Sequence, residues 1–194
     1  MGIREEKNDI RRRYKSTRSQ ISPQDKENMD NQILKFFLST LGYRYSNGIL
    51  AYMSIENEVD TKKMITAAFN SGKRVALPKC DPSKRTMNFY EIKSFDDLEK
   101  GMFNIMEPNT WKCHLADISN YSICLVPAVV YDIYGCRLGY GHGYYDRFLE
   151  HYKGVSMGLI YTQFIIDDLP KGRYDKTVDL LITEKGVRRS QKWG

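Results

Sequence analysis

Short apolar runs that alternate with helical patterns are the feature that most constrains how this sequence folds. The central runs, such as 48–53 and 123–126, are continuously apolar rather than alternating between apolar and polar residues. Strands buried on both faces have this composition, and they form parallel sheets whose faces are covered by helices. We therefore expect an α/β fold: one domain over residues 1–194, built as a three-layer α/β/α sandwich around a mostly parallel sheet.

Individual elements follow from the same patterns. The expected strands cover 48–53, 75–77, 86–92, 123–126, 155–161 and 180–183, and the expected helices cover 5–20, 23–40, 61–70 and 144–152. Ser22 and Pro23 are typical of a helix start, as cap and first helical residue. Pro78 should end the strand before it. Residues 96–120 are rich in polar groups, so we expect loops and short turns there.

Composition limits the class of protein. The 194 residues are 41% hydrophobic and 12% aromatic, which is enough to supply a core. The longest apolar run, 123–131, is too short to cross a bilayer, and the charged first eight residues carry no apolar secretory region. The four cysteines are widely spaced, which argues against a zinc site. We expect a cytoplasmic monomer without a membrane partner.

Positive charge is concentrated in the basic first helix, at about 5–20. Residues 1–18 hold seven basic and three acidic groups, so they supply +4 of the net charge of +6. Lys7, Arg11, Lys15 and Arg18 recur at helical spacing and form one stripe. This stripe is either a solvated helix face or an anion-binding face. Because the rest of the chain is nearly balanced, a general nucleic-acid-binding surface is not expected.

A glycine-rich segment at 137–149 carries the strongest functional signal. Gly139, Gly141 and Gly143 alternate with larger residues and precede the helix expected at 144–152. Such a loop can aim several backbone N–H groups at one anion, and a helix start adds its own free N–H groups. The segment therefore predicts a phosphate cradle, although a tight strand-to-helix turn without a ligand is the alternative.

Asp146 adds a metal to this hypothesis. Its carboxylate would repel a bound phosphate, and a divalent cation between them removes the conflict, since Mg²⁺ is commonly held by carboxylates together with substrate phosphates. The loop does not match the dinucleotide-binding fingerprint, because Tyr144 stands where a third Gly or Ala is needed. The Gly-Lys-Ser/Thr of the P-loop is also missing from the sequence.

Three groups follow predicted parallel strands and could converge. Glu58 follows 48–53, Lys79 follows 75–77, and the glycine loop follows 123–126. Ligands of open α/β sheets bind at the carboxyl ends of the strands, so we expect these groups at one edge. For Glu58, capping of the helix at 61–70 is a competing interpretation, although Asp60 alone could serve as the cap.

The motifs, taken together, resemble the 5-formyltetrahydrofolate cyclo-ligase family over nearly the whole chain. The residues that carry the resemblance are Val126-Pro127, Asp132, Gly135, Arg137-Leu138-Gly139-Tyr140-Gly141 and Gly143-Tyr144-Tyr145-Asp146-Arg147, with support from Lys7 to Arg11, Tyr52-Met53-Ser54 and Glu58-Val59-Asp60-Thr61. The resemblance implies a fold similar to the sugar-phosphate isomerase and CoA-transferase type. It also implies a reaction that uses ATP and Mg²⁺ to cyclise 5-formyltetrahydrofolate to 5,10-methenyltetrahydrofolate, with release of ADP and phosphate and without a covalent protein nucleophile.

The resemblance further implies a set of site residues. For ATP these are Lys7, Arg11, Arg137, Leu138, Gly139, Tyr140, Gly141, His142, Gly143, Tyr144 and Tyr145. For the folate they are Met53 and Glu58 on one side, with Tyr140, Gly141, His142, Gly143 and Tyr144 on the other. For the metal they are Asp146 and Asp175. His142 stands where the family often has Gly or Lys, which leaves the role of this position open.

Two other functions compete with this hypothesis. One is a sugar-phosphate isomerase on the same fold that works without ATP, in which Asp146 and the Lys7/Arg11 pair would have no obvious role. The other is a non-catalytic protein that binds nucleic acid or another anion through the basic helix. Binding to nucleic-acid phosphates would show a steep dependence on salt.

Overall fold

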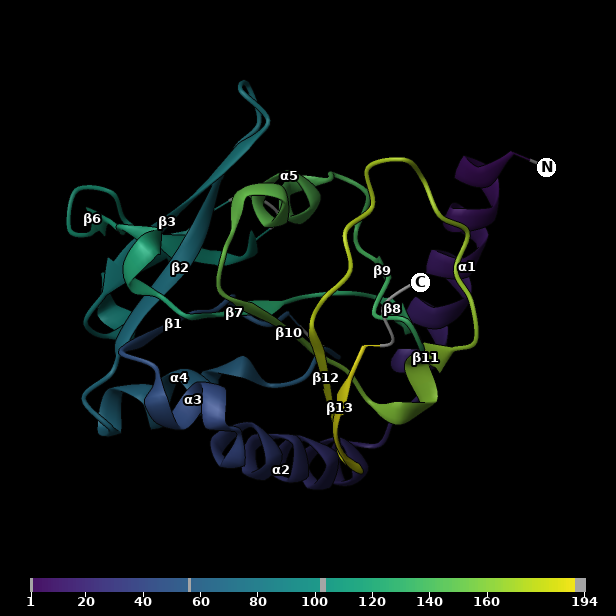
Figure 1. The fold of residues 1–194 in the computed structure, drawn as a ribbon, viewed down its shortest axis with the longest axis horizontal. Helices are drawn as coiled ribbons and strands as arrows, with labels where there is room; N and C mark the ends of the chain where they lie inside the picture. Colours follow the sequence, from purple (N-terminus) through teal and green to yellow (C-terminus); the bar gives the residue numbers. More distant parts are fainter. Residues whose placement is uncertain (1, 56, 102–103, 191–194) are drawn as a thin grey trace.

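Five parallel strands form the middle of an eight-stranded sheet (Figure 1). The computed structural model describes residues 2–55, 57–101 and 104–190. In sheet order the strands are β13 (Gly186–Arg189), β12 (Leu180–Thr183), β10 (Val155–Leu159), β7 (Ile123–Val126), β1 (Gly48–Leu50), β2 (Arg74–Asp81), β3 (Thr86–Ile92) and β6 (His114–Leu115). The outer strands β13, β3 and β6 pair antiparallel. The predicted mostly parallel sheet is confirmed.

Helices cover both faces of this sheet, which confirms the α/β/α sandwich. Figure 1 shows α2 (Pro23–Ser39), α3 (Leu41–Tyr45) and α4 (Thr61–Asn70) along one face and α5 (Tyr144–His151) on the other. Short 3₁₀ turns lie at η1 (Phe95–Asp97), η3 (Ile118–Asn120) and η4 (Thr162–Phe164). As predicted, α2 starts with Pro23 after Ser22, whose hydroxyl accepts a 3.1 Å hydrogen bond from the Asp25 N–H.

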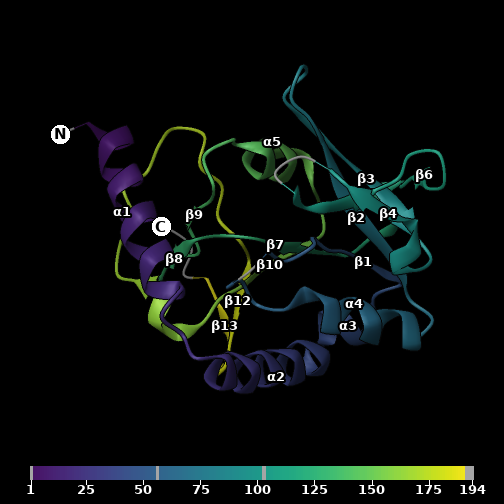
Figure 2. The same cartoon turned by 180° about the vertical axis from the view of Figure 1, so that it is seen from behind.

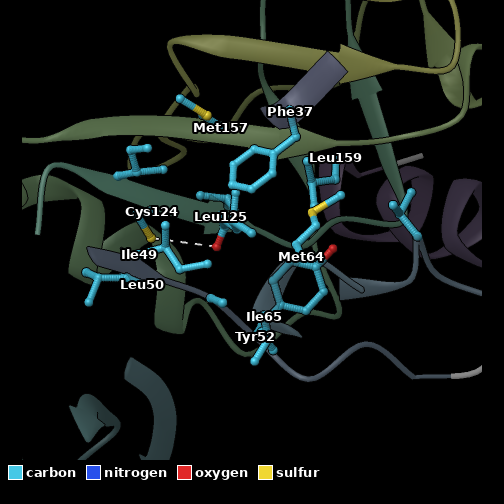
Figure 3. Close-up of a cluster of buried hydrophobic side chains, with 14 of the residues drawn as sticks. Phe37, Ile49, Leu50, Tyr52, Met64, Ile65, Cys124, Leu125, Met157 and Leu159 are labelled. Carbon is cyan, nitrogen blue, oxygen red and sulfur yellow. Dashed lines mark hydrogen bonds between the residues drawn. The ribbon is translucent and has the colours of Figure 1, made fainter. Parts of the chain in front are cut away.

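The main core lies on both faces of the sheet, against α2–α4 on one side and against α5 on the other. Figure 3 shows the ring of Phe37 directed from α2 toward the strands that carry Met157, Leu159 and Leu125. These four side chains are buried almost completely. Full burial of an aliphatic or aromatic side chain of this size contributes about 1.5–3 kcal/mol. The continuous apolar runs of the sequence thus correspond to strands packed on both faces.

Pro78 does not end β2, contrary to expectation. In the described sheet β2 pairs with β1 only at Arg74, Val75 and Ala76, whereas its pairing with β3 continues from Val75 to Asp81. Pro78 therefore lies where β2 borders one strand rather than two. A missing N–H is tolerated at such an edge, so the hairpin of β2 and β3 extends beyond the body of the sheet (Figure 1).

Other departures are additions of short elements. Residues 96–120, expected as loops and turns, also contain β4 (Leu98–Lys100), β5 (Met106–Pro108) and β6. A second, small sheet has the strand order β11 (Ile165–Ile166), β8 (Val130–Asp132) and β9 (Arg137–Leu138). In the sequence, β8 and β9 precede the glycine loop and β11 follows it. The glycine loop therefore follows β9 rather than β7. Strands of two or three residues carry too little periodicity to be predicted.

The basic helix α1 (Ile3–Arg18) packs beside the small sheet, at the periphery of the molecule (Figures 1 and 2). Its Ile10 and Tyr14 contact a second apolar cluster that includes Val129 and Leu138. Arg18 is only 5% exposed and donates hydrogen bonds of 2.9 Å to the carbonyls of Ala128 and Val129. This end of the stripe is a structural anchor, so the interpretation as a solvated face is wrong there. Within the described ranges, no helix combines the length and apolar character needed to cross a membrane.

Candidate active site

A cavity of about 530 Å³ lies between α1 and the glycine loop. Lys7 and Arg11 line it from the helix, and Tyr140 and Gly141 line it from the loop. Ile3, Arg4 and Asn8 complete the lining. The structure therefore brings the basic stripe and the glycine loop together, although they are about 130 positions apart in the sequence. The cavity has the positive charge that a phosphate-bearing ligand needs.

The basic residues of α1 are held by contacts with the facing segments. Nε of Arg11 donates a 2.8 Å hydrogen bond to the Gly139 carbonyl. Burial lowers the pKa of Arg11, and the nearby Asp175 carboxylate opposes that shift. Lys7 forms an ion pair with Asp175, and Nζ of Lys15 lies 4.8 Å from the centre of the Tyr140 ring. These contacts offset the repulsion between like charges along the stripe.

Two glycines give the loop its shape. Gly141 has φ +105°, and Gly143 has φ +68° in the left-handed region at the cap of α5. A side chain at either position would be strained, because residues other than glycine rarely adopt these angles. Gly143 places the start of α5 directly behind the loop. The first-turn N–H groups of α5, which lack helical partners, therefore lie directly after the loop.

Arg147, at the start of α5, contacts the loop in a way that the sequence does not predict. Its guanidinium donates hydrogen bonds to the carbonyl of His142 (3.0 Å) and to the carbonyl of Arg85 at the tip of the β2–β3 hairpin (2.8 Å). Arg147 therefore links the outer side of the loop to the hairpin. The contact with the hairpin uses the backbone carbonyl of Arg85, 62 positions earlier, and a backbone carbonyl leaves no trace in the sequence from which the contact could be predicted.

Glu58 and Tyr140 meet at the other side of the loop. Oε1 of Glu58 accepts a 2.5 Å hydrogen bond from the Tyr140 hydroxyl, and Oε2 accepts one of 3.0 Å from the Ile55 N–H. Burial raises the pKa of Glu58, while the Tyr140 hydroxyl and the Ile55 N–H oppose that rise. The cap of α4 is Asp60, which accepts a 2.9 Å hydrogen bond from the Lys62 N–H. The capping interpretation of Glu58 is therefore wrong.

The predicted convergence at the sheet edge is only partly observed. Glu58 and the glycine loop meet, and Met53 lies in the buried segment that leads from β1 toward Glu58. Lys79, in contrast, pairs with Glu99 of β4 at 2.7 Å and donates to the Pro108 carbonyl. The extension of β2 past Pro78 carries Lys79 along the hairpin, which explains its different neighbours.

Asp146 and Asp175 lie on neighbouring segments. Oδ1 of Asp146 accepts hydrogen bonds from Arg137 (2.9 Å) and from the Lys176 N–H (3.1 Å). Asp175, one residue before Lys176, accepts a 2.8 Å hydrogen bond from the Gly172 N–H as well as pairing with Lys7. The described part of the chain contains no group of three or more His, Cys, Asp or Glu side chains that could hold a metal ion. Two carboxylates combined with phosphate oxygens are nevertheless a donor set that suits Mg²⁺.

The other residues predicted to bind ATP differ in how exposed their side chains are. His142 is exposed, whereas Leu138 is buried in the second apolar cluster. The Arg137 side chain is only 3% exposed and forms an ion pair with Asp146. The Tyr145 hydroxyl is buried without a hydrogen-bond partner among the described residues. Leu138 and Tyr145 could therefore serve a nucleotide through their backbone N–H groups rather than their side chains.

Comparison with known proteins decides the family. The sequence model of the 5-formyltetrahydrofolate cyclo-ligase family matches residues 3–184. The chain belongs to this family. The resemblance seen in the sequence is therefore confirmed, and so is the expectation that the protein is an enzyme.

Named members of the cyclo-ligase family match along most of their length. The Escherichia coli K12 5-formyltetrahydrofolate cyclo-ligase is 26% identical over 174 residues, which cover 88% of this chain and 96% of that protein. A probable 5-formyltetrahydrofolate cyclo-ligase of Caenorhabditis elegans is 26% identical over 194 residues, with 94% of each chain covered. The solved structure of Aquifex aeolicus 5,10-methenyltetrahydrofolate synthetase superposes with a TM-score of 0.85 at 29% identity, covering 97% of this chain and 94% of that one.

Proposed function

We propose that the protein cyclises 5-formyltetrahydrofolate to 5,10-methenyltetrahydrofolate in a reaction that consumes ATP and releases ADP and phosphate. Family membership supports the choice of reaction. The observation that carries the proposal is the cavity in which Lys7 and Arg11 face Tyr140 and Gly141. Because Tyr140 also contacts Glu58, this cavity adjoins the segment around Glu58, to which we assign the folate.

In this proposal the cavity holds the ATP phosphates. Lys7 and Arg11 supply positive charge from one side, and the N–H groups of 139–145 supply donors from the other. Arg11 is already oriented by its hydrogen bond to the Gly139 carbonyl, so little reorganisation is needed when a phosphate arrives. Positioning and neutralisation of charge are the main contributions that a protein makes to phosphoryl transfer.

Asp146 and Asp175 would hold Mg²⁺ together with phosphate oxygens. When bound, the ion would neutralise charge on the phosphates. In the structure Arg137 pairs with Asp146 and Lys7 pairs with Asp175. These ion pairs hold the two carboxylates in place beside the cavity.

The chemistry then proceeds between the two substrates. The formyl oxygen attacks the γ-phosphorus of ATP, an O–P bond forms, and the bond to the bridging oxygen breaks to release ADP. The neighbouring folate nitrogen attacks the activated carbon, loses its proton, and displaces phosphate. The protein contributes orientation of the two reactants, for which a close and aligned approach can supply several kcal/mol, about 7–11 in favourable cases.

The folate would bind beside Met53 and Glu58. Glu58 is a buried carboxylate held by Tyr140 and the Ile55 N–H. A carboxylate in this environment can accept hydrogen bonds from the N–H donors of a pterin ring. Tyr140 would then be shared between the two substrates, since it lines the phosphate cavity and also contacts Glu58.

A spectroscopic assay tests the proposal. Purified protein given 5-formyltetrahydrofolate, ATP and Mg²⁺ should develop the near-ultraviolet absorbance of methenyltetrahydrofolate and release ADP in equal amount. Omission of ATP should abolish both signals. Product formation at the same rate without ATP would refute the proposed reaction.

The competing functions receive no support from the geometry. Lys7, Arg11 and Arg18 contact Asp175, the Gly139 carbonyl and the 128–129 carbonyls of the same chain. These residues therefore do not form a free basic face for nucleic acid. No specific observation favours a sugar-phosphate isomerase.

A further inference from the structure

Asp30 is a buried carboxylate on α2 that the proposed mechanism does not use. It is 4% exposed, and three donors surround it: the Tyr161 hydroxyl at 2.7 Å, Nζ of Lys26 at 2.6 Å and the Asp60 N–H at 3.2 Å. A buried charge is costly unless it is paired and hydrogen-bonded. Asp30 is therefore held by a lysine of its own helix and by donors from two other segments, those that carry Tyr161 and Asp60.

Tyr161 connects this carboxylate to Glu58. The residue is fully buried just after β10, and its hydroxyl lies 2.7 Å from Oδ1 of Asp30 and 3.3 Å from the Glu58 carbonyl. Asp30 also accepts from the N–H of Asp60, two residues after Glu58. The single proton of the Tyr161 hydroxyl is shared between the nearer Asp30 carboxylate and, more weakly, the Glu58 carbonyl, so the backbone that carries Glu58 is held firmly at 60 by Asp30 and more loosely at 58 by Tyr161.

The contacts continue from Glu58 into the loop. The carboxylate of Glu58 is fixed at one oxygen by Tyr140 and at the other by the Ile55 N–H. A shift of the 58–60 backbone would therefore move the carboxylate relative to Tyr140. A hydrogen bond of 2.5 Å tolerates little displacement, because its strength falls steeply with distance and angle.

We propose that Asp30 and Tyr161 are positioning residues for folate binding, and that they act through the backbone of Glu58. The inference rests on the proposed function, since it takes Glu58 to be the group that contacts the folate. Neither residue touches the substrate. Their role is to hold one arrangement of the 58–60 segment, so that the Glu58 carboxylate is already oriented when the pterin arrives.

Steady-state kinetics of Tyr161→Phe provide the first test. The variant keeps the buried ring and removes only the hydroxyl. KM for 5-formyltetrahydrofolate should rise about threefold to tenfold, which is the equivalent of one hydrogen bond, while KM for ATP stays within about twofold. Tyr43→Phe is a matched control, because Tyr43 is also buried and its hydroxyl contacts Ser71 on α4's C-terminal side. The control should leave both KM values unchanged.

Asp30 variants provide an independent arm. Asp30→Asn retains an acceptor oxygen for Tyr161 and Asp60, whereas Asp30→Ala removes it. KM for the folate should therefore rise more in Asp30→Ala than in Asp30→Asn. If Asp30→Ala does not fold, Tyr161→Phe decides the matter, because it preserves the packing of the ring.

A double-mutant cycle separates positioning from general stability. If Tyr161 acts through Glu58, then Tyr161→Phe should have little further effect on folate affinity, measured by calorimetry, in a Glu58→Gln background. Full additivity, or an unchanged folate KM in active Tyr161→Phe protein, would overturn the inference and leave the proposed function standing. A wild-type protein without ATP-dependent product formation would instead overturn the proposed function, and the inference with it.

Discussion

The Tyr140 hydroxyl donates a 2.5 Å hydrogen bond to Oε1 of Glu58, 82 positions earlier in the chain. This contact joins the segment after β1 to the glycine loop. Tyr140 also lines the cavity that Lys7 and Arg11 share with Gly141. One tyrosine thus borders the two regions to which we assign the two substrates, so its variants can distinguish the contributions of these regions.

Tyr140→Phe should weaken folate use selectively. The hydrogen bond to a carboxylate is lost, and KM for 5-formyltetrahydrofolate should rise roughly tenfold or more. The Tyr140 hydroxyl also opposes the rise in the pKa of Glu58 caused by burial, so its removal should raise that pKa further. The acid limb of kcat/KM for the folate should therefore move to higher pH. An unchanged pH profile would show that Glu58 does not control folate binding.

Glu58→Gln should impair folate binding and remove a pH-dependent contribution to stability. The pKa of Glu58 is raised by burial above its ordinary value, so this group stabilises the folded state below the unfolded pKa and loses that contribution as pH rises through the folded pKa. Glutamine does not titrate, but it offers one acceptor oxygen where Glu58 uses two, for Tyr140 and the Ile55 N–H. The melting temperature of Glu58→Gln relative to that of the wild type should therefore be higher at neutral pH than at acid pH. A relative melting temperature that rises toward acid pH would contradict this account.

Lys7→Met should impair ATP use more than folate use. Lys7 lines the cavity and pairs with Asp175, and the loss of one charge-assisted contact should raise KM for ATP roughly tenfold. Arg12→Met is the matched control, because the Arg12 side chain lies on the same helix but is 81% exposed. An equal rise in KM for ATP in both variants would mean that ATP binding depends on the total charge of the helix and not on the position of Lys7.

Asp146→Asn should raise the Mg²⁺ concentration required for half-maximal turnover by about tenfold or more, as is typical when groups around a metal are altered. The asparagine keeps an oxygen for Arg137 and the Lys176 N–H, so folding should survive. A full Mg²⁺ titration of both proteins checks this expectation. Superimposable titration curves would exclude Asp146 as a ligand.

Gly143→Ala should damage both stability and nucleotide affinity. Gly143 has φ +68°, where an alanine costs about 1–2 kcal/mol, and a Cβ would lie 3.0 Å from the Arg147 guanidinium. Gly72→Ala is an apt control, since Gly72 has φ +66° and its Cβ would meet no atom within 4 Å. Both variants should melt earlier, but only Gly143→Ala should raise KM for ATP. A similar KM for ATP in both variants would show that the conformation of the loop does not affect ATP binding.

The sequence was sufficient to predict the central layers of this fold but not the contacts that complete its site. Ser22-Pro23 and the apolar run at 123–126 have purely local causes, and both elements start where they were expected. The prediction that Pro78 ends its strand was wrong, because a proline interrupts a strand only where its missing N–H would pair with a neighbouring strand. Arg18 looked like a surface charge because its carbonyl partners lie more than 100 positions away. Likewise, the pairing of Arg137 with Asp146 and of Glu58 with Tyr140 depends on tertiary structure.

The docking of α1 has a consequence for how the protein is made. The helix leaves the ribosome before the partners of Arg18, Arg11 and Lys7, which lie 110, 128 and 168 positions downstream of these residues. Closing such long loops is slow compared with forming a helix. The contacts that hold α1 in place are therefore incomplete until synthesis has passed residue 175, and a nascent chain that stalls earlier exposes a charged helix whose Lys7 lacks its carboxylate partner.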